Sequence, residues 1–355
     1  MTSTVQTAVI GVTGYAGAEL ARLLLRHPRL RSASPVFAGR IDEKDIAHGG
    51  VPLAGIHPAL ADSTGSGDLK LQPFSWELLA ERGVDVLFLA TPHEQSRQWV
   101  PEALARGLRV IDLSGAWRLN DAANRAIYAF ENERSAQADA TQAQAVYGMP
   151  ELHRKQIARA HLVANPGCYA TSIVLALKPL VAAGLVDLNC GIVCDAKSGV
   201  SGAGKAPTAK THFMYAADNL SAYSVFTHRH TGELLEQIGV DAADITFTPH
   251  LLPIPRGILS TIYVRFKEPQ TRGSIEQVYS KFFAASPMVR LYKDTLPQIQ
   301  YSVRTSYADI GFELSHDGRR AVIVSCLDNL LKGASSQAVQ NLNVMQGWGE
   351  AEGLE

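Results

Sequence analysis

The sequence predicts an α/β protein in which a parallel-sheet domain comes first and an α+β domain with a mixed, largely antiparallel sheet follows. Apolar strand-like runs alternate with helical runs up to about residue 165, which is typical of a parallel sheet covered by helices. After that point, several strand-like runs are joined by loops without helices. The length of 355 residues is enough for two domains.

The composition excludes several classes of protein. There are 33 basic and 34 acidic residues, and the net charge of -1 offers no support for nucleic acid or an anionic membrane as a partner. No apolar run reaches the roughly 18 residues of a membrane span, and the first residues lack a secretion signal. Four cysteines are too few for a disulfide framework at this length. We expect a cytoplasmic protein with a small-molecule substrate.

The first part of the chain has five expected strands, at Thr7–Val12, Ser34–Ala38, Val84–Thr91, Leu108–Leu113 and His161–Ala164. One helix runs from Ala16 until His27 and Pro28 end it, and another ends at Arg106. Residues 62–68 are expected to form a surface loop. This order is the one that a parallel sheet requires.

The second part has five expected strands, at Gly191–Asp195, Asp244–Leu252, Leu259–Phe266, Gln298–Arg304 and Ala321–Cys326. A helix begins at Cys168 and extends to about Ala182. An amphipathic helix at Ser335–Met345 is the last strong element. A terminal helix of this kind must bury its apolar stripe, so we expect the chain to return to the first domain.

Glycines separate the first strand from its helix, in the run Gly11, Val12, Thr13, Gly14, Tyr15, Ala16, Gly17. Glycine lets the backbone turn tightly and approach a pyrophosphate, whose charge then lies at the helix N-terminus. A tight turn without a ligand is the alternative. The position between a strand and an amphipathic helix favours a dinucleotide, and hence a Rossmann-type domain.

The second strand indicates which dinucleotide is bound. NAD-binding domains usually place an acid about 20 residues after the glycines, at the end of this strand. Here residues 34–40 contain no acid and end in Arg40. An acid would repel a 2′-phosphate, whereas Arg40 could receive it, so the sequence favours NADP over NAD. An Arg40 that only contacts solvent is the alternative.

A second motif, Asn165-Pro-Gly-Cys168, joins an apolar strand to an apolar helix. The unsatisfied N–H groups of a helix N-terminus favour a thiolate, so Cys168 is the candidate nucleophile. An inert, buried Cys168 is the alternative. The other three cysteines lie within apolar strand-like runs and are expected to be buried: Cys190, Cys194 and Cys326.

Two histidines, His228 and His230, precede Glu233 in a turn. A cysteine nucleophile needs a proton acceptor near neutral pH, and histidine is the natural one. The two side chains point in different directions outside a helix, so we expect one of them to face the thiol. A metal site is an alternative, but the typical spacing and a third ligand are lacking. A second alternative is that both histidines have only a structural role, with their hydrogen bonds made within the fold.

Polar loops that follow expected strands could bind anions. The first carries Ser114 and Arg118, the second carries Ser198, Gly199, Ser201 and Lys205, and a proline-rich segment carries His250 and Arg256. Backbone N–H groups, hydroxyls and cations of this kind bind phosphates and carboxylates. Each loop could also be a plain turn.

Together, these motifs resemble the N-acetyl-γ-glutamyl-phosphate reductase family of arginine biosynthesis, which is related to aspartate-semialdehyde dehydrogenase. The resemblance runs over nearly the whole chain. It is carried by residues 11–20, 112–118, 147–151, 165–171, 198–204, 228–233, 249–257 and 328–334.

The resemblance implies NADPH-dependent reduction of N-acetyl-L-glutamyl 5-phosphate to the 5-semialdehyde and phosphate. Cys168 would form a thioester, one histidine of the pair would manage the proton, and Glu233 could orient that histidine. Besides the glycine motif and Arg40, the expected cofactor contacts are Ser198, Gly199 and Asn329. The expected substrate contacts are Ser114, Arg118, Asn165, Ser201, Lys205, His250 and Arg256.

We therefore expect an NADP-binding domain from residues 1–167 and 330–355 and a catalytic and dimerisation domain from residues 168–329. The resemblance implies a homo-oligomer, a dimer or a tetramer. Three alternatives remain. The first is a related acyl-phosphate reductase, similar to aspartate-semialdehyde dehydrogenase or to the aminoadipyl-phosphate reductase of a lysine pathway. The others are a non-catalytic NADP-binding sensor and a metal-binding protein. The sensor would need neither Cys168 nor the histidine pair. No metal is expected.

Overall fold

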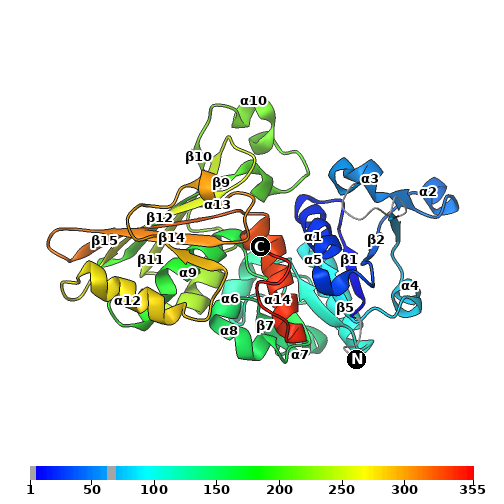
Figure 1. Ribbon diagram of the computed structural model, residues 1–355, viewed down its shortest axis with the longest axis horizontal. Coiled ribbons are helices and arrows are strands. Elements are labelled where there is room, and N and C mark those ends of the chain that lie inside the picture. The colour runs from blue at the N-terminus through cyan, green and yellow to red at the C-terminus, as the bar shows by residue number, and fades with distance from the viewer. Residues whose placement is uncertain (1–4, 62–68, 134) are drawn as a thin grey trace. The chain divides into compact units, whose positions relative to one another are not determined.

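The computed structural model of the chain describes residues 5–61, 69–133 and 135–355, so residues 62–68, expected as a surface loop, lie outside the described residues. Contacts divide the chain into two units (Figure 1). Unit 1 takes the chain up to residue 118, residues 130–165 and residues 335–355. Unit 2 takes residues 119–129 and 166–334. Residues 119–129, which we expected in the NADP-binding domain, thus pack within unit 2.

Unit 1 contains an eight-stranded sheet in the order β3-β4-β2-β1-β5-β6-β8-β7. Its strands are β1 (Thr7–Ile10), β2 (Val36–Gly39), β3 (Val51–Pro52), β4 (Lys70–Pro73), β5 (Val86–Leu89), β6 (Arg109–Asp112), β7 (Ala145–Tyr147) and β8 (Leu162–Ala164). Within the described residues, only β3 and β4 pair antiparallel. The prediction of a parallel sheet is confirmed, and β1 and β5 are buried throughout.

The helices of unit 1 are α1 (Tyr15–Arg26), α2 (Glu43–Ala47), α3 (Leu53–Ile56), α4 (Trp76–Glu81), α5 (His93–Ala105), α7 (Ala136–Gln142), α8 (Pro150–Ile157) and α14 (Ser336–Gln346). In Figure 1, α14 is red and lies against α1 and α8. Gln337 and Asn341 on α14 both donate to the carbonyl oxygen of Gly148. The last helix of the described chain therefore packs within unit 1.

Unit 2 contains a seven-stranded sheet in the order β10-β11-β9-β12-β15-β14-β13. Its strands are β9 (Ile192–Gly199), β10 (Ser221–Ala222), β11 (Ile245–Leu252), β12 (Ile258–Arg265), β13 (Val289–Leu291), β14 (Ala308–Leu314) and β15 (Arg320–Leu327). Among the described strands, β9 with β11 and β13 with β14 are parallel and the other pairs antiparallel. The predicted mixed, largely antiparallel sheet is confirmed.

The helices of unit 2 are α6 (Ala122–Arg125), α9 (Cys168–Ala182), α10 (Phe213–Ala216), α11 (Thr231–Leu234), α12 (Arg272–Phe282) and α13 (Ile299–Ser302). The helix α9 has the predicted bounds and is almost entirely buried against β12, β15 and α12. Its all-round apolar sequence is typical of a helix enclosed on every side. Within the described part of the chain, no helix is long and apolar enough to span a membrane.

One predicted strand is wrong. Residues 298–304 form α13 and a turn, and β15 pairs with β12 on one side and, on the other, with β14, which the sequence did not indicate. The side chains of Ile299 and Val303 occupy the space that Gly257 leaves, because a Cβ on Gly257 would lie 2.4 Å from Ile299 Cγ2. Arg304 then takes a left-handed conformation with φ of 66°. Tertiary packing has overridden the alternating pattern.

The prediction for Cys190 is also wrong, whereas Cys194 and Cys326 are buried as expected. Cys190 is exposed, since it ends a short 3₁₀ turn (Leu188–Cys190) before β9 begins. Gly191 follows in a left-handed conformation with φ of 70°, so the strand starts at Ile192, one residue later than expected. The thiol of Cys190 donates to Asp187 Oδ2 at 3.3 Å.

A buried histidine connects the end of α1 to the C-terminal residues. His27 Nε2 lies 3.0 Å from Asn343 Oδ1, and its ring stacks on Trp348 with 5.3 Å between centroids. Gly353 packs on the same ring, since its Cβ would lie 2.5 Å from His27 Cδ2. Burial lowers the pKa of His27 below its usual 6.5. The last residues of the chain thus enclose a neutral imidazole.

This burial predicts a loss of stability in acid. The unfolded chain binds a proton on His27 more readily than the folded chain, so the stabilisation is complete above pH 6.5 and is lost as the pH falls toward the lowered pKa. Replacing His27 by Gln should flatten this fall, by at most about 1.4 kcal/mol per pH unit. Urea unfolding at mildly alkaline and mildly acidic pH measures it.

The control is His316→Gln, which changes an exposed histidine between β14 and β15 and should leave the slope of stability against pH as it is. If His27→Gln and the parent protein showed the same slope, the buried imidazole would not be its source.

Candidate active site

In unit 1, the glycine turn between β1 and α1 has the geometry of a phosphate cradle. Gly11 has φ of 97°, and a Cβ on Gly17 would lie 2.1 Å from the carbonyl oxygen of Gly11. Only glycine therefore fits at both positions. The N-cap of α1 is Gly14, which gives the first turn no side-chain hydrogen bond. The backbone N–H groups of this first turn are thus available to an anion.

A groove of about 470 Å³ opens along this turn, where the carboxyl ends of the parallel strands meet. Thr13 and Gly14 line it, as does the exposed Arg40, which directly follows β2. Thr91 follows β5 and also lines the groove, and its buried hydroxyl makes no hydrogen bond within the described residues. The groove therefore fits a dinucleotide. Arg40 lies at the end of β2, and the Thr91 hydroxyl could form a hydrogen bond with the bound molecule.

Also in unit 1, a buried carboxylate organises the loop after β6. Asp112 accepts hydrogen bonds from Ser114 N at 3.0 Å, from Ser114 Oγ at 2.7 Å and from Ser96 Oγ at 2.8 Å. Burial raises the pKa of Asp112, and these hydrogen bonds oppose the rise. The hydroxyl of Ser114 is thus part of the support of the loop.

The same loop fixes Arg118 against Asn165. The guanidinium donates to the carbonyl oxygen of Asn165 at 2.7 Å and to that of Leu113 at 2.9 Å. The amide of Asn165 accepts from Asn341 Nδ2 at 3.0 Å. The three substrate residues expected in this unit, Ser114, Arg118 and Asn165, are therefore gathered in one network.

In unit 2, Cys168 is the first residue of α9 and is half-buried. The N-cap is Gly167, which offers no side-chain hydrogen bond, and the first turn of the helix has no acidic residue. The helix dipole and the unsatisfied N–H groups therefore favour a negative charge on the sulfur.

The buried carboxylate of Glu233 joins this turn to the histidine segment. Glu233 Oε2 accepts the backbone N–H of Gly167 at 2.9 Å, and Oε1 lies 4.0 Å from His230 Nε2. A Cβ on Gly167 would lie only 2.4 Å from the same nitrogen. The imidazole of His230 thus rests on the peptide that precedes Cys168.

His228 has a different environment. Its ring packs edge-on against Tyr169, Tyr223 and Phe247, at 5.3 to 5.6 Å between centroids, and its Nδ1 accepts the N–H of His230 at 3.1 Å. Burial, followed by the positive charge of Arg229, lowers the pKa of His228 to about 4. His228 is therefore neutral near pH 7 and acts as a support for His230.

Asn329 joins two of the expected anion loops in unit 2. Its amide donates to Ser201 Oγ at 2.9 Å and accepts the N–H of Gly257 at 2.8 Å. Gly199 lies directly on the proline-rich segment, since its Cβ would be 2.7 Å from Arg256 N. Ser198, Gly199, Ser201, Arg256 and Asn329 therefore form one cluster.

Two of the expected substrate residues lie elsewhere in unit 2. Lys205 is exposed beyond the Ser201 turn. His250 lies on the sheet face opposite Phe247, which contacts Tyr169, and its Nδ1 is 3.1 Å from Asp195 Oδ1. Only the main chain of His250 reaches α9, where its carbonyl oxygen accepts the Tyr169 hydroxyl at 2.7 Å.

The sequence reasoning missed three residues of this region. Tyr169 follows Cys168 directly, and Asp328 precedes Asn329, so both stood inside motifs that we had singled out. Tyr223 packs edge-on against His228, and no sequence signal pointed to it. Within the described residues, no group of three His, Cys, Asp or Glu side chains could hold a metal ion.

Two protein-family models match the chain. One, described as "Semialdehyde dehydrogenase, NAD binding domain", matches residues 6–160, and the other, "Semialdehyde dehydrogenase, dimerisation domain", matches residues 168–329. Among solved structures, aspartate semialdehyde dehydrogenase II from Vibrio cholerae is 18% identical with a TM-score of 0.67, and the match covers 97% of this chain and 98% of that one. At this identity the likeness shows the fold alone.

Curated relatives are more similar. Proteins named N-acetyl-gamma-glutamyl-phosphate reductase from Dehalococcoides mccartyi and Methanococcus maripaludis are 41% and 39% identical to this chain. The alignments cover 99% and 98% of this chain, and 97% of each relative. With similarity at this level over the full length, the chain belongs to the N-acetyl-gamma-glutamyl-phosphate reductase family.

Proposed function

We propose that this protein reduces N-acetyl-L-glutamyl 5-phosphate to N-acetyl-L-glutamate 5-semialdehyde with NADPH, releasing phosphate, in the biosynthesis of L-arginine. One observation carries the proposal: Cys168 begins α9 beside an imidazole, and a buried carboxylate holds the preceding peptide. This arrangement can form a thiolate and manage its proton. The names of the relatives supply the substrate.

The thiol proton of Cys168 passes to His230, and the thiolate attacks the acyl carbon of the substrate. A C–S bond forms, the C–O bond to phosphate breaks, and His230 returns the proton to the departing phosphate. Bound NADPH supplies the hydride that reduces the thioester carbonyl. The resulting oxyanion collapses, which expels the Cys168 thiolate and releases the semialdehyde. Solvent then protonates the thiolate, so one proton is consumed for each turnover.

Glu233 has two tasks in this scheme. It fixes the peptide N–H of Gly167, and its second oxygen lies near enough to His230 to stabilise the imidazolium while the proton rests there. His228 is less suited to this part, because burial and the charge of Arg229 lower its pKa to about 4 and so make it a weak proton acceptor.

We infer NADP(H) as the cofactor. The family model indicates a nicotinamide dinucleotide, and the groove in unit 1 fits one. The choice between the two dinucleotides rests on Arg40, which lines the groove where NAD-specific domains carry an acid. Its charge complements a 2′-phosphate. Ser198, Gly199 and Asn329 stay predictions as cofactor contacts.

For the substrate, the cations that we assign are Arg118 in unit 1 and Arg256 in unit 2. Arg118 is held by the carbonyl oxygens of Asn165 and Leu113, so its orientation is set before the substrate arrives. Asn165 supports Arg118 through its carbonyl oxygen, and Ser201 accepts a hydrogen bond from Asn329, which holds Gly257 next to Arg256. Ser114, Lys205 and His250 stay predictions as substrate contacts.

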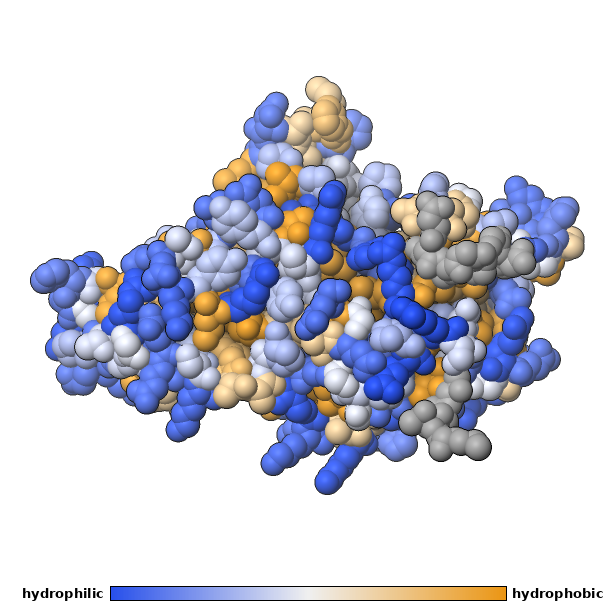
Figure 2. Space-filling model, in the orientation of Figure 1, coloured by the Kyte–Doolittle hydropathy of each residue, from blue (hydrophilic) through white to orange (hydrophobic). Residues whose placement is uncertain are grey.

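We also propose that the protein is a homo-oligomer. The model that matches residues 168–329 is described as a dimerisation domain. Figure 2 shows apolar side chains at the tip that α10 forms, where Phe213, Met214 and Tyr215 are 77%, 75% and 67% exposed. Patches of this kind mark protein contacts.

We propose that the protein is cytoplasmic. Its four cysteines are free thiols, which agrees with the reducing conditions of the cytoplasm.

The reverse reaction tests the function. With N-acetyl-glutamate 5-semialdehyde, phosphate and the oxidised cofactor, we expect phosphate-dependent NADPH formation, and slower turnover with NAD⁺ than with NADP⁺. Cys168→Ser should lower kcat by at least about 1,000-fold while NADPH binding persists, since the covalent step is lost. Cys190→Ser, at the exposed cysteine, should keep full activity. No phosphate-dependent turnover would refute the proposal, and better turnover of aspartate semialdehyde would reassign the substrate.

The two histidines should respond differently. Replacing His230 by Asn removes the proton acceptor and should lower kcat on the order of 100- to 10,000-fold with little change in KM. Replacing His228 by Asn removes only support, so we expect a smaller loss of kcat and a lower melting temperature. Steady-state kinetics and thermal melts of both variants measure this, and a larger loss of kcat in His228→Asn would exchange the two roles.

Two glycines of the cradle form a matched pair. A Cβ on Gly17 would lie 2.1 Å from the Gly11 carbonyl oxygen, whereas one on Gly14 would lie at an ordinary 3.6 Å from it. Gly17→Ala must therefore displace the turn, and we expect NADPH to bind more weakly by about ten-fold or more, while Gly14→Ala binds much nearer to the parent. NADPH fluorescence titration measures both, and equal affinities would show that the turn does not hold the cofactor.

A further inference from the structure

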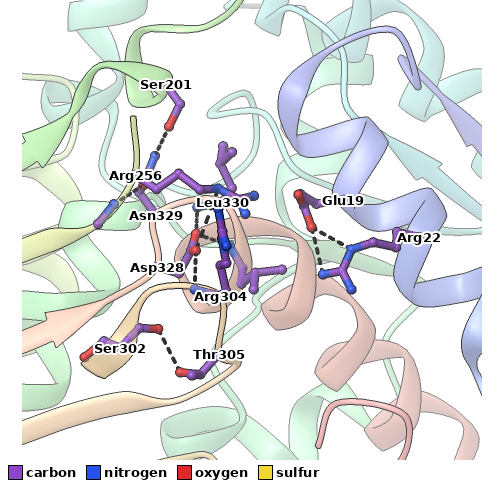
Figure 3. A network of polar contacts seen from close by, with 12 residues as sticks. Glu19, Arg22, Ser201, Arg256, Ser302, Arg304, Thr305, Asp328, Asn329 and Leu330 are labelled. Atoms are coloured by element: carbon purple, nitrogen blue, oxygen red, sulfur yellow. Dashed lines mark hydrogen bonds and ion pairs between the residues drawn. The ribbon is translucent and has the colours of Figure 1, made fainter. Parts of the chain in front are cut away.

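Asp328 is a buried carboxylate that the scheme above does not use. It follows β15 and begins the turn at residues 328–333. Its Oδ1 accepts the N–H groups of Leu330 at 2.8 Å and Leu331 at 3.2 Å, and its Oδ2 accepts the N–H of Arg304 at 2.8 Å. Figure 3 shows the carboxylate at the centre of these contacts. The side chain therefore holds its own turn and a second segment together.

Asp328 also faces a cation. Arg256 Nε lies 3.8 Å from Asp328 Oδ2, and the Arg256 side chain is largely buried. A buried carboxylate is costly unless it is paired and hydrogen-bonded, and here three N–H groups and a guanidinium fulfil both conditions. The hydrogen bond to Arg304 also holds that residue in a left-handed conformation, which is strained for a residue other than glycine. Asp328 thus fixes the position of Arg256.

The far end of the same turn contacts the nucleophile. The carbonyl oxygen of Asp328 accepts the N–H of Gly333 at 2.9 Å. A Cβ on Gly333 would lie 2.7 Å from Cys168 Cβ and 3.3 Å from Cys168 Cα. Gly333 therefore packs directly behind Cys168, and any movement of the turn moves this support.

Asn329, the next residue, joins the turn to the anion loops, as Figure 3 also shows through its bond to Ser201. Its second bond, to the N–H of Gly257, holds the segment that carries Arg256. The turn at 328–333 is accordingly connected to Cys168 at one end and to Arg256 at the other.

We propose that Asp328 is a positioning residue that aligns the Cys168 nucleophile, through Gly333, with the Arg256 guanidinium that binds the substrate anion. The inference rests on the proposed function, since it takes Cys168 as the nucleophile and Arg256 as a substrate cation. Asp328 itself touches neither substrate nor cofactor in this proposal.

The test compares Asp328→Asn with Gly333→Ala, both in a Cys190→Ser background, so that the half-buried Cys168 is the only cysteine of the described chain that is not buried. Asn keeps the shape of Asp, but its amide nitrogen must face either an N–H group or a guanidinium, all of which are donors. We expect iodoacetamide to alkylate Cys168 several-fold more slowly in both variants. A misplaced nucleophile should also lower kcat by on the order of 100-fold.

The Michaelis constant separates the two ends of the turn. In Asp328→Asn the pairing of Arg256 is lost, so we expect KM for the acyl phosphate to rise and kcat to fall. In Gly333→Ala the severe contact is with Cys168, since the added Cβ would lie 2.7 Å from Cys168 Cβ but 3.3 Å from the Asp328 carbonyl oxygen, so kcat should fall while KM stays near the parent value. A KM that is unchanged in Asp328→Asn would overturn the link to Arg256.

Asp309→Asn is the matched control. Asp309 is equally buried in the same unit and is paired with Arg290 at 2.6 Å, but none of its hydrogen bonds or ion pairs involves the turn at 328–333. We expect it to lose stability without a change in Cys168 alkylation. If Asp309→Asn slowed the alkylation of Cys168 as much as Asp328→Asn does, the role of Asp328 would be merely structural. Alkylation of Cys168 at the parent rate in Gly333→Ala would overturn the proposal, even if Asp328→Asn did not fold. Because alkylation requires no substrate, it responds as expected even if the reductase activity is absent.

Discussion

The hydrogen bond from the Gly167 peptide to the buried Glu233 carboxylate is the contact on which the catalytic half of the protein depends. It joins two segments 66 residues apart in sequence and places His230 on the peptide before Cys168. An unpaired carboxylate at this depth would be strongly destabilising, so the pair forms only when the fold brings both partners together. The proton chemistry and the stability of this region therefore have a common origin.

Glycines, which have no side chain, shape the candidate site as much as the residues with side chains do. Gly17 lets α1 approach the Gly11 carbonyl, Gly167 leaves room for the His230 ring, and Gly333 lets a turn pack behind Cys168. At each of these positions even one methyl group would force a displacement. Close packing of this kind limits the motion of groups that must meet within a few tenths of an ångström.

Local patterns allowed the sheet classes, the bounds of α9 and the position of Cys168 to be predicted from the sequence. The failures lie where distant segments decide. Residues 298–304 alternate like a strand, but the space above Gly257 holds them as a helix, and Cys190 is exposed because Gly191 delays the start of β9. The different environments of His228 and His230 depend on Tyr169 and Gly167, more than 50 residues away, so no local pattern could distinguish them.

The position of α14 has a consequence for how the chain reaches its native state. This helix is buried almost throughout and contacts α1 and α8, although all of unit 2 from residue 166 to residue 334 precedes it in the chain. During synthesis, every residue of unit 2 is available before unit 1 can close its core. Until residues 335–355 have left the ribosome, the surfaces of α1 and α8 that α14 covers stay open to water and to chaperones. Unit 1 therefore completes its core only after the whole of unit 2 has been synthesised.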